Sequence, residues 1–275
     1  MKVTSLFLLL TLNLIPATAF GSFEHRSPDA RVEAMGGAGV ALENPPFGIY
    51  YNPASSAADK NRSAGISYAL PLGQSSFDSF YGTLQTNALS FDRNGSAGIS
   101  WLNYGSSLYN ETFTYLTYST KVAGPLRAGI SAGLLDRDTA AKESESTLGI
   151  NLGVLATLSS SLNLGASIFN LNRPETGTNG ENAPSTSFAG MAYKPSTGIV
   201  LNAVVEKQEK KDARLRAGGE VRVLSFLNLR AGFTTEPSTF SGGAGFIFKS
   251  VQGDIALVRH PELGTGSWYT MRIVF

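Results

Sequence analysis

Residues able to carry out chemistry are few in this sequence and lie far apart. The chain has 275 residues, no cysteine and two histidines, His25 and His260. The lack of cysteine excludes disulfides, thiolate nucleophiles and cysteine-based metal sites. His260 lies beside Glu262, the only start for a hydrolytic pair of the kind that sits on a barrel rim, and solvated side chains account for both histidines more simply. We therefore expect no enzyme activity, no metal and no cofactor.

The balance of charged residues argues against a nucleic-acid partner. The chain has 22 Lys and Arg and 21 Asp and Glu, and charged residues make up 16% of it. A nucleic-acid binder would usually carry a basic face, which a net charge of +1 does not supply. We expect no nucleic-acid partner.

The N-terminus has the pattern of a secretory signal. Lys2 precedes an apolar run over residues 6–15, and Ala17-Thr18-Ala19 forms a small-x-small cleavage site. The run is too short for a membrane helix, which needs about 20 residues. A buried N-terminal helix is the other interpretation. We expect residues 1–19 to be a cleaved signal peptide, and no later apolar stretch reaches 18 residues.

A Gly-rich segment follows, and its glycines do not form a nucleotide loop. The sequence "GGAGV" contains Gly37 and Gly39, but Leu42 stands where a dinucleotide fingerprint needs its third glycine, and no βαβ pattern follows. The segment also contains apolar and aromatic side chains with surface to bury, which a linker does not need. Glycine permits close backbone packing and proline needs no ladder partner, so residues 20–62 suit a plug inside a lumen.

Residues 63–275 alternate between apolar and small or polar side chains with period two. This pattern is typical of strands with one apolar face, and no helical stripe competes with it. The class is all-β. We expect fourteen strands, at residues 63–72, 82–93, 96–105, 110–121, 126–136, 145–158, 162–172, 185–194, 197–207, 212–223, 226–234, 239–249, 251–259 and 266–275.

The connections and the polar face favour a transmembrane antiparallel barrel. Short turns alternate with mostly longer loops, as in outer-membrane barrels. A soluble β-sandwich explains the alternation nearly as well, but not the signal peptide and the strand number. Charged residues share the polar face, and in a barrel they would form a charge network in the lumen: Arg127, Arg214, Arg216, Glu220, Arg222, Arg230, Asp254 and Arg272.

The chain ends on alternating hydrophobic residues and a terminal phenylalanine. Tyr269, Met271, Ile273 and Phe275 share one face. This ending resembles the signal that the barrel-assembly machinery of Gram-negative outer membranes reads, although Thr270 replaces a glycine often found there. Trp268, Tyr269 and Tyr193 are candidates for interfacial aromatic girdles.

Three spaced elements of the Gly-rich segment carry a family resemblance. Pro28 to Arg31, Ala34 to Ala41, and Asn52-Pro53-Ala54 together resemble the N-terminal signature of the FadL-like outer-membrane superfamily, most closely its PorV/PorQ branch. The resemblance implies a fourteen-stranded barrel with an N-terminal hatch, a lateral opening to lipid and passage of small hydrophobic molecules such as fatty acids or hydrocarbons. The hatch and gating residues that it implies are Gly36, Gly37, Gly39, Asn52, Pro53 and Ala54.

For Asn52 two roles remain open: an amide that holds the hatch shut, or the start of a turn at Asn52-Pro53. The expected organisation is a signal peptide at 1–19, a hatch at 20–62 and a barrel at 63–275. The branch also leaves open a non-catalytic role in type IX-like protein secretion, with exported proteins as partners. The chain is shorter than fatty-acid transporters of this kind and its longest loop is polar, which weakens an external apolar capture site.

The remaining expected partners are lipids of the outer membrane. The charged run 206–214 predicts a solvated external hairpin tip, where Lys207, Lys210 and Lys211 would meet lipopolysaccharide phosphates.

Overall fold

A computed structural model describes residues 22–43, 46–57, 62–71, 73, 77–86, 95–140, 142–176 and 181–275. The predicted signal peptide lies outside these residues. Among them, no helix is long and apolar enough to cross a membrane.

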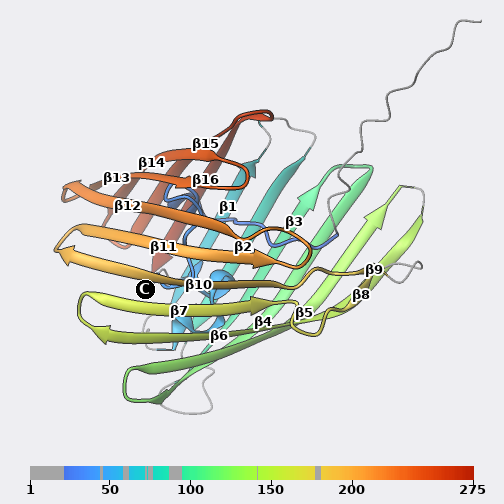
Figure 1. The fold of residues 1–275 in the computed structure, drawn as a ribbon, viewed down its shortest axis with the longest axis horizontal. Helices are drawn as coiled ribbons and strands as arrows, with labels where there is room; N and C mark the ends of the chain where they lie inside the picture. The colour runs from blue at the N-terminus through green and yellow to red at the C-terminus, as the bar shows by residue number, and fades with distance from the viewer. Residues whose placement is uncertain are drawn as a thin grey trace, which may run out of the picture.

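The described strands confirm the expected fold class: fourteen of them form a closed antiparallel barrel (Figure 1). Each pairs with its neighbours along the chain, and β1 closes on β16 with Ser63 opposite Val274. Closure leaves no strand edge unpaired, which a membrane span requires. The strands are β1 Ser63–Leu70, β2 Asp78–Thr86, β3 Gly95–Gly105, β4 Tyr109–Ala123, β5 Leu126–Thr139, β6 Lys142–Ser159, β7 Leu162–Phe169, β10 Thr186–Ser196, β11 Ile199–Gln208, β12 Arg214–Leu224, β13 Leu227–Thr234, β14 Thr239–Phe248, β15 Val251–His260 and β16 Gly264–Val274.

Two details of the strand prediction are wrong. The second run was expected at 82–93, whereas β2 begins at Asp78, because Phe80 faces outward in an alternation that the serine-rich sequence before it obscures. The long polar connection after β7 holds a separate small hairpin of β8 (Glu175–Thr176) and β9 (Glu181–Asn182). Its strands are too short to show a period.

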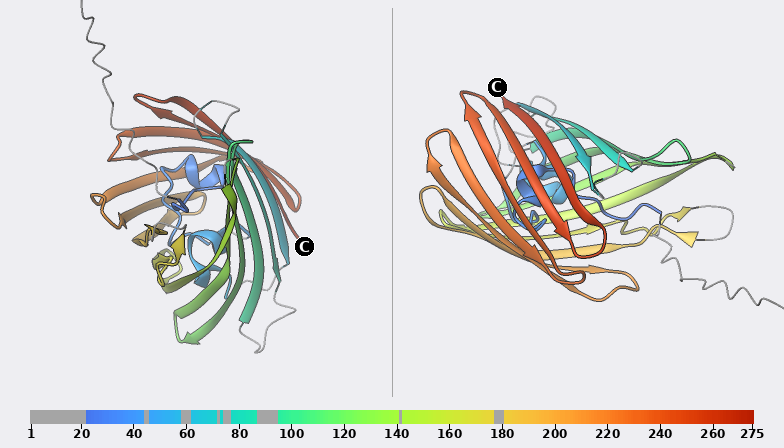
Figure 2. Two further views of the ribbon diagram at one scale, coloured as in Figure 1. Left: turned by 90° about the vertical axis from the view of Figure 1, so that its right-hand side faces the viewer. Right: turned by 90° about the horizontal axis from the view of Figure 1, so that it is seen from above.

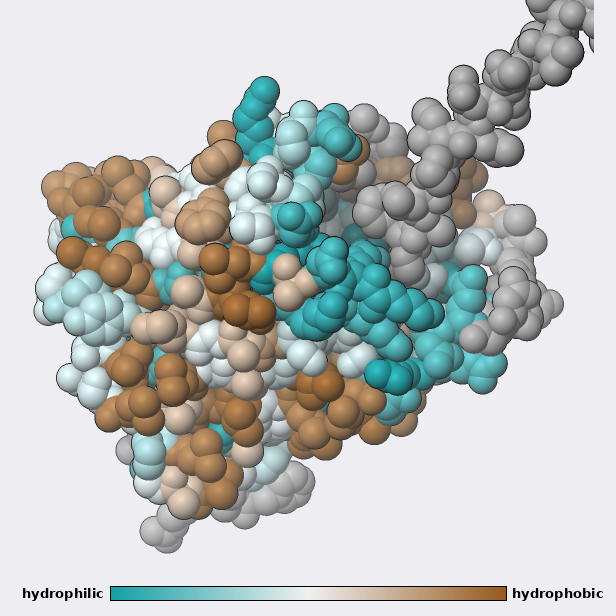
Figure 3. All heavy atoms as spheres, in the orientation of Figure 1, coloured by the Kyte–Doolittle hydropathy of each residue, from teal (hydrophilic) through white to brown (hydrophobic). Residues whose placement is uncertain are grey.

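The barrel has a short-turn end and a long-loop end. Two-residue turns at 124–125, 160–161, 197–198, 225–226 and 249–250 lie at the first. The connections 170–185, 209–213 and 235–238 lie at the second. In Figure 3 hydrophobic residues cover much of the visible wall, and hydrophilic ones gather toward the long-loop end.

The apolar face of the strands points outward. Exposed side chains recur on every second residue, as with Ile66, Tyr68, Leu152 and Val154, while the intervening Ser67 and Gly153 face inward. Trp268 corrects one expectation: its side chain is 6% exposed and lies inside the barrel, so it belongs to no outer girdle. Tyr193 and Tyr269 do lie outside.

The N-terminal segment lies inside the barrel (Figure 2). It carries α1 (Ala30–Glu33), α2 (Gly48–Tyr51) and the 3₁₀ helix η1 (Pro53–Ser56), and nearly all of its side chains from Pro28 to Ala57 are buried. We call its described residues, 22–43 and 46–57, the plug.

A charge on the outer wall tests the direction of the faces. Leu152 lies mid-wall between Ile130 and Ile168, and Leu158 lies next to a turn. Leu152→Arg should lower the free energy of unfolding in lipid vesicles by about 2–4 kcal/mol, and Leu158→Arg by about 0–1 kcal/mol. Denaturant titration measures both. Equal losses at the two positions would mean that the outer face does not contact lipid.

Candidate functional site

Glycines on the inner wall let the plug backbone touch the barrel directly. A Cβ atom added to any of seven inward glycines would come within 2.1–2.6 Å of a plug atom, closer than real contacts allow. At Gly232 the nearest atom is the backbone nitrogen of Gly36, at 2.2 Å. We call the set the glycine girdle: Gly65, Gly98, Gly129, Gly153, Gly165, Gly218 and Gly232.

Asn52 joins the plug to the wall through its side-chain amide. Its Nδ2 donates to the carbonyl oxygens of Val40 in the plug (2.8 Å) and Val154 in β6 (2.9 Å). Its Oδ1 accepts from the backbone N–H of Ala54 at 3.0 Å, which caps η1. Both roles considered for Asn52 are therefore present in the geometry.

The other hatch candidates lie at the same contact. Gly36 and Gly37 have φ of 71° and 74°, a conformation that favours glycine, where the chain turns after α1 against β12 and β13. Gly39 packs on the ring of Tyr51. Pro53 and Ala54 lie in η1 against Gly129 and Gly153.

A buried charge network joins α1 to the wall. Arg230 contacts Glu220 at 2.6 Å and Asp254 at 2.7 Å, and Arg272 contacts Asp254 at 2.6 Å. The plug completes it, because Arg31 binds Glu220 through two nitrogens at 2.8 and 2.9 Å and Arg272 reaches Asp29 at 3.3 Å. Three carboxylates thus face three guanidinium groups, which compensates the cost of burying them.

Four of the predicted lumen charges lie apart from this network. Arg214 and Arg216 pair with Glu206 on β11, and Arg216 also donates to the carbonyl of Gly36 at 3.3 Å. Arg127 binds Glu43 of the plug at 2.8 Å. Arg222 was wrongly placed in the network: it is exposed near the β12–β13 turn, where its nearest partner is Asn228 at 3.4 Å.

The sequence prediction missed the partners of these arginines. Asp29, Arg31 and Glu43 belong to the plug, and only their position in the Gly-rich segment pointed to them. Glu206 was assigned to a solvated tip, but it is 4% exposed. Its alternation with Val204 and Gln208 on β11 was the available signal.

Aromatic rings fill the lumen on the long-loop side of the girdle. Tyr50 packs on Tyr81 at 5.4 Å between ring centroids, and Phe23 on Phe113 at 5.5 Å. His25, expected to be solvated, lies among these rings, 4.3 Å from Phe169. Burial lowers the pKa of His25 to about 3, so the imidazole is neutral.

The remaining candidates for catalytic residues, His260 and Ser131, form local hydrogen bonds that belong to a turn and to neighbouring strands. The Nδ1 of His260 accepts the backbone N–H groups of Glu262 and Leu263 in a turn, both at 3.1 Å. The sequence Gly129 to Gly133 matches Gly-x-Ser-x-Gly, but it lies within β5, and its Ser131 shares a hydrogen bond with Thr117. No group of His, Asp and Glu able to hold a metal occurs among the described residues.

The four candidates for the barrel-assembly signal lie on one side of the last strand. Tyr269, Met271, Ile273 and Phe275 are exposed on the outer wall, while Arg272 between them faces the lumen. The end of the chain also closes the barrel, because Arg62 and Phe275 exchange two backbone hydrogen bonds.

Solved structures with the same fold include hydrocarbon channels and a FadL homologue. The chain is similar to the Pseudomonas putida toluene transporter TodX (TM-score 0.67, 12% identity, 93% of this chain and 98% of that one). It is similar to the CymD monoaromatic hydrocarbon channel (0.66, 13%, 92% and 98%) and to a Pseudomonas aeruginosa FadL homologue (0.66, 12%, 93% and 99%). At these identities the likeness shows the fold.

No family model and no curated protein sequence matches the chain. The likeness to FadL-type barrels is consistent with the broader resemblance read from the sequence, and it gives no support to the PorV/PorQ branch.

Wall glycines offer a direct test of the plug contact. In Gly232→Ala, the added methyl group would overlap Gly36 and Met35, so the plug must shift and ion conductance in planar bilayers should rise severalfold or more. Gly82→Ala is the matched control, since nothing lies within 4 Å of its added carbon. Unchanged conductance in a folded Gly232→Ala barrel would show that the contact does not seal the lumen.

The neutral His25 predicts a dependence of stability on pH. An unfolded histidine takes up a proton below its ordinary pKa of 6.5, whereas folded His25 does so only near 3. Its contribution is therefore full above pH 6.5 and declines as pH falls toward 3. Urea midpoints from pH 7 to 4 should fall more steeply for wild type than for His25→Phe, and parallel curves would contradict the assignment.

Proposed function

We propose that this protein is an outer-membrane channel that passes small hydrophobic molecules, with its own N-terminal plug as the gate. The observation that carries the proposal is a barrel whose outer wall is apolar and whose lumen holds an internal segment. The likeness to channels for toluene and monoaromatic hydrocarbons supports the same class of cargo.

One part of the lumen, along β3 to β6, has the apolar side chains that hydrophobic cargo needs. Phe113, Tyr115, Leu102, Leu135 and Leu155 face inward from β3 to β6, and each is at most 5% exposed. A water-filled pore has a polar lining instead. In this protein the polar side chains of the lumen are largely paired with one another or with the plug.

The long-loop end offers an entrance. A pocket of about 280 Å³ lies there, and Phe23 and Leu135 supply its apolar side chains. Its polar lining comes from β6 and β8: Glu145, Ser146, Thr147, Glu175 and Thr176. An apolar molecule bound there would meet Phe23, the first aromatic residue of the plug. Displacing the plug at this point opens the aromatic part of the lumen.

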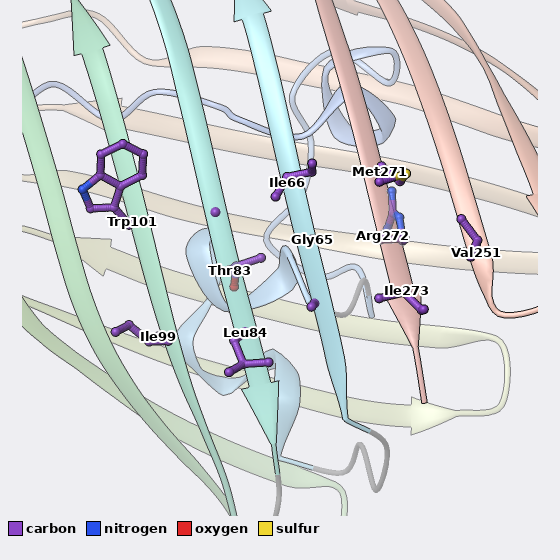
Figure 4. A pocket seen from close by; sticks show the side chains of 12 residues that line it. Gly65, Ile66, Thr83, Leu84, Ile99, Trp101, Val251, Met271, Arg272 and Ile273 are labelled. Atoms are coloured by element: carbon purple, nitrogen blue, oxygen red, sulfur yellow. The ribbon is translucent and has the colours of Figure 1, made fainter.

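An apolar groove on the outer wall marks a lateral exit. It has a volume of about 490 Å³ and is lined by residues of β1, β2, β3, β15 and β16, among them Ile66, Leu84 and Trp101 (Figure 4). Behind it, the Cβ that Gly65 lacks would lie 2.5 Å from the ring of Phe47, so one strand separates groove and plug. A hydrophobic molecule that leaves here enters the membrane without crossing water.

The remaining expectations fit this proposal. Cleavage of residues 1–19 would deliver the chain through the secretory route, and the barrel-assembly machinery would read the outward residues of β16. The six hatch residues would hold the plug at the girdle. Lys207, Lys210 and Lys211 surround the loop 209–213, where lipopolysaccharide phosphates would meet them.

Uptake into liposomes tests the function. We expect wild-type protein to accelerate entry of a labelled hydrocarbon or fatty acid over protein-free vesicles. Asn52→Ala removes three hydrogen bonds, one of them between plug and wall, and should raise the rate up to about tenfold, since buried polar groups are left unpaired.

Asn103→Ala is the matched control, because within the described residues the side chain of Asn103 bonds to the wall residues Asn110 and Thr112 and not to the plug. It should behave as wild type. Background uptake by wild type, by Asn52→Ala and by a variant lacking residues 24–58 would refute the channel.

A further inference from the structure

One plug side chain occupies a box of four aromatic rings. The His25 ring centroid lies 4.3 Å from Phe169, 4.8 Å from Phe188, 5.2 Å from Tyr50 and 6.1 Å from Tyr51. Phe169 and Phe188 come from neighbouring wall strands, β7 and β10, and the two tyrosines come from α2. We call these four residues the aromatic box.

His25 fits the box in shape but not in chemistry. Its Nε2 is enclosed and has no hydrogen-bond partner in the described part of the chain. The crevice beside it, lined by Gly37, Val40 and Phe188, has no room for a water molecule that could supply one. An unpaired polar atom is costly to bury, so a ring without that nitrogen would suit the box better.

The residues that carry His25 are held near the long-loop end by fewer contacts with the wall than the rest of the plug. We call residues 22–28 the strap. Glu24 pairs with Lys211 at 2.6 Å, and this pair contributes little to stability because Lys211 is 40% exposed. The stronger attachment is at Phe23, which packs on Phe113 and whose backbone N–H donates to the buried Glu111 at 2.8 Å. The glycine girdle and the charge network hold the plug from Asp29 onward.

We propose that the aromatic box is a binding site for a single planar aromatic ring, and that His25 is a weak internal occupant which such a ring displaces. The site takes an uncharged benzene-sized ring, because the box gives four ring contacts and leaves the Nε2 of His25 unpaired. Displacement moves the strap, while the rest of the plug stays seated. The inference rests on the proposed function only in placing the ring on the route of passage.

The box should distinguish a ring with a π system from a saturated ring of similar size. Edge-to-face contacts depend on the ring quadrupole, which toluene has and methylcyclohexane lacks. The two hydrocarbons have the same number of carbon atoms, and the saturated one is the more hydrophobic. A site that binds by hydrophobicity alone would therefore bind methylcyclohexane at least as tightly as toluene.

Trp268 supplies the readout. Its Nε1 donates to the carbonyl oxygen of Ser27 in the strap at 3.1 Å. The only other tryptophan is Trp101, on the outer wall. In a Trp101→Phe background, the emission of purified protein in alkyl maltoside micelles therefore reports the strap, and titration with each hydrocarbon gives an apparent Kd.

Two substitutions at one position should move that Kd in opposite directions. His25→Ala empties the box and should lower the Kd for toluene by about tenfold, whereas His25→Phe supplies a better internal occupant and should raise it by about tenfold. The same pair of changes at His260, which lies in a turn, should leave the Kd unchanged. Heat-modifiable migration on a gel shows that each barrel is folded.

The result expected is a toluene-dependent change in Trp268 emission, weaker for methylcyclohexane, with opposite shifts in the two His25 variants. Equal response to both hydrocarbons, or His25 variants that match those at His260, would overturn the proposal. Liposome uptake separates the two ideas. Uptake without these emission changes removes the box and leaves the channel, and emission changes without uptake remove the channel and leave the box.

Discussion

The rest of this structure depends on direct contact between the plug and the barrel wall at positions where the wall strands carry glycine. Where a barrel strand carries a glycine facing inward, the plug lies against the strand itself, as Gly36 does at Gly232. Because van der Waals contact is lost steeply with small separations, a shift of the plug by about 1 Å would forfeit much of this contact.

Polar contacts hold the plug on one side of this glycine contact, and aromatic contacts lie on the other side. On one side, the charge network pairs Asp29 and Arg31 with charged residues of the wall. Movement of α1 would leave these buried charges unpaired, which costs free energy. On the long-loop side the plug contributes rings to a stack that an apolar molecule can join. In the proposed channel, the tight backbone contact would close the lumen to ions, and the rings would form an apolar path up to it.

The sequence predicted what depends on local alternation and missed what depends on contacts across the lumen. Period-two patterning located the strands because every second residue lies on the apolar outer face, and it misplaced β2 where serines precede Phe80. It could not show that His25 enters a box built by Phe169 and Phe188, more than 140 residues away. Nor could it pair Arg31 with Glu220, because a charge in a Gly-rich segment has no period.

A reversible bond between plug and wall tests the gating account most directly. Ser56 in η1 and Ser119 in β4 place their hydroxyl oxygens 2.6 Å apart, and the chain has no cysteine to interfere. In the double variant Ser56→Cys and Ser119→Cys, a disulfide confirmed by gel should abolish hydrocarbon uptake into liposomes, and reduction should restore it. Equal uptake by the oxidised and reduced protein would show that hydrophobic molecules cross without movement of the plug.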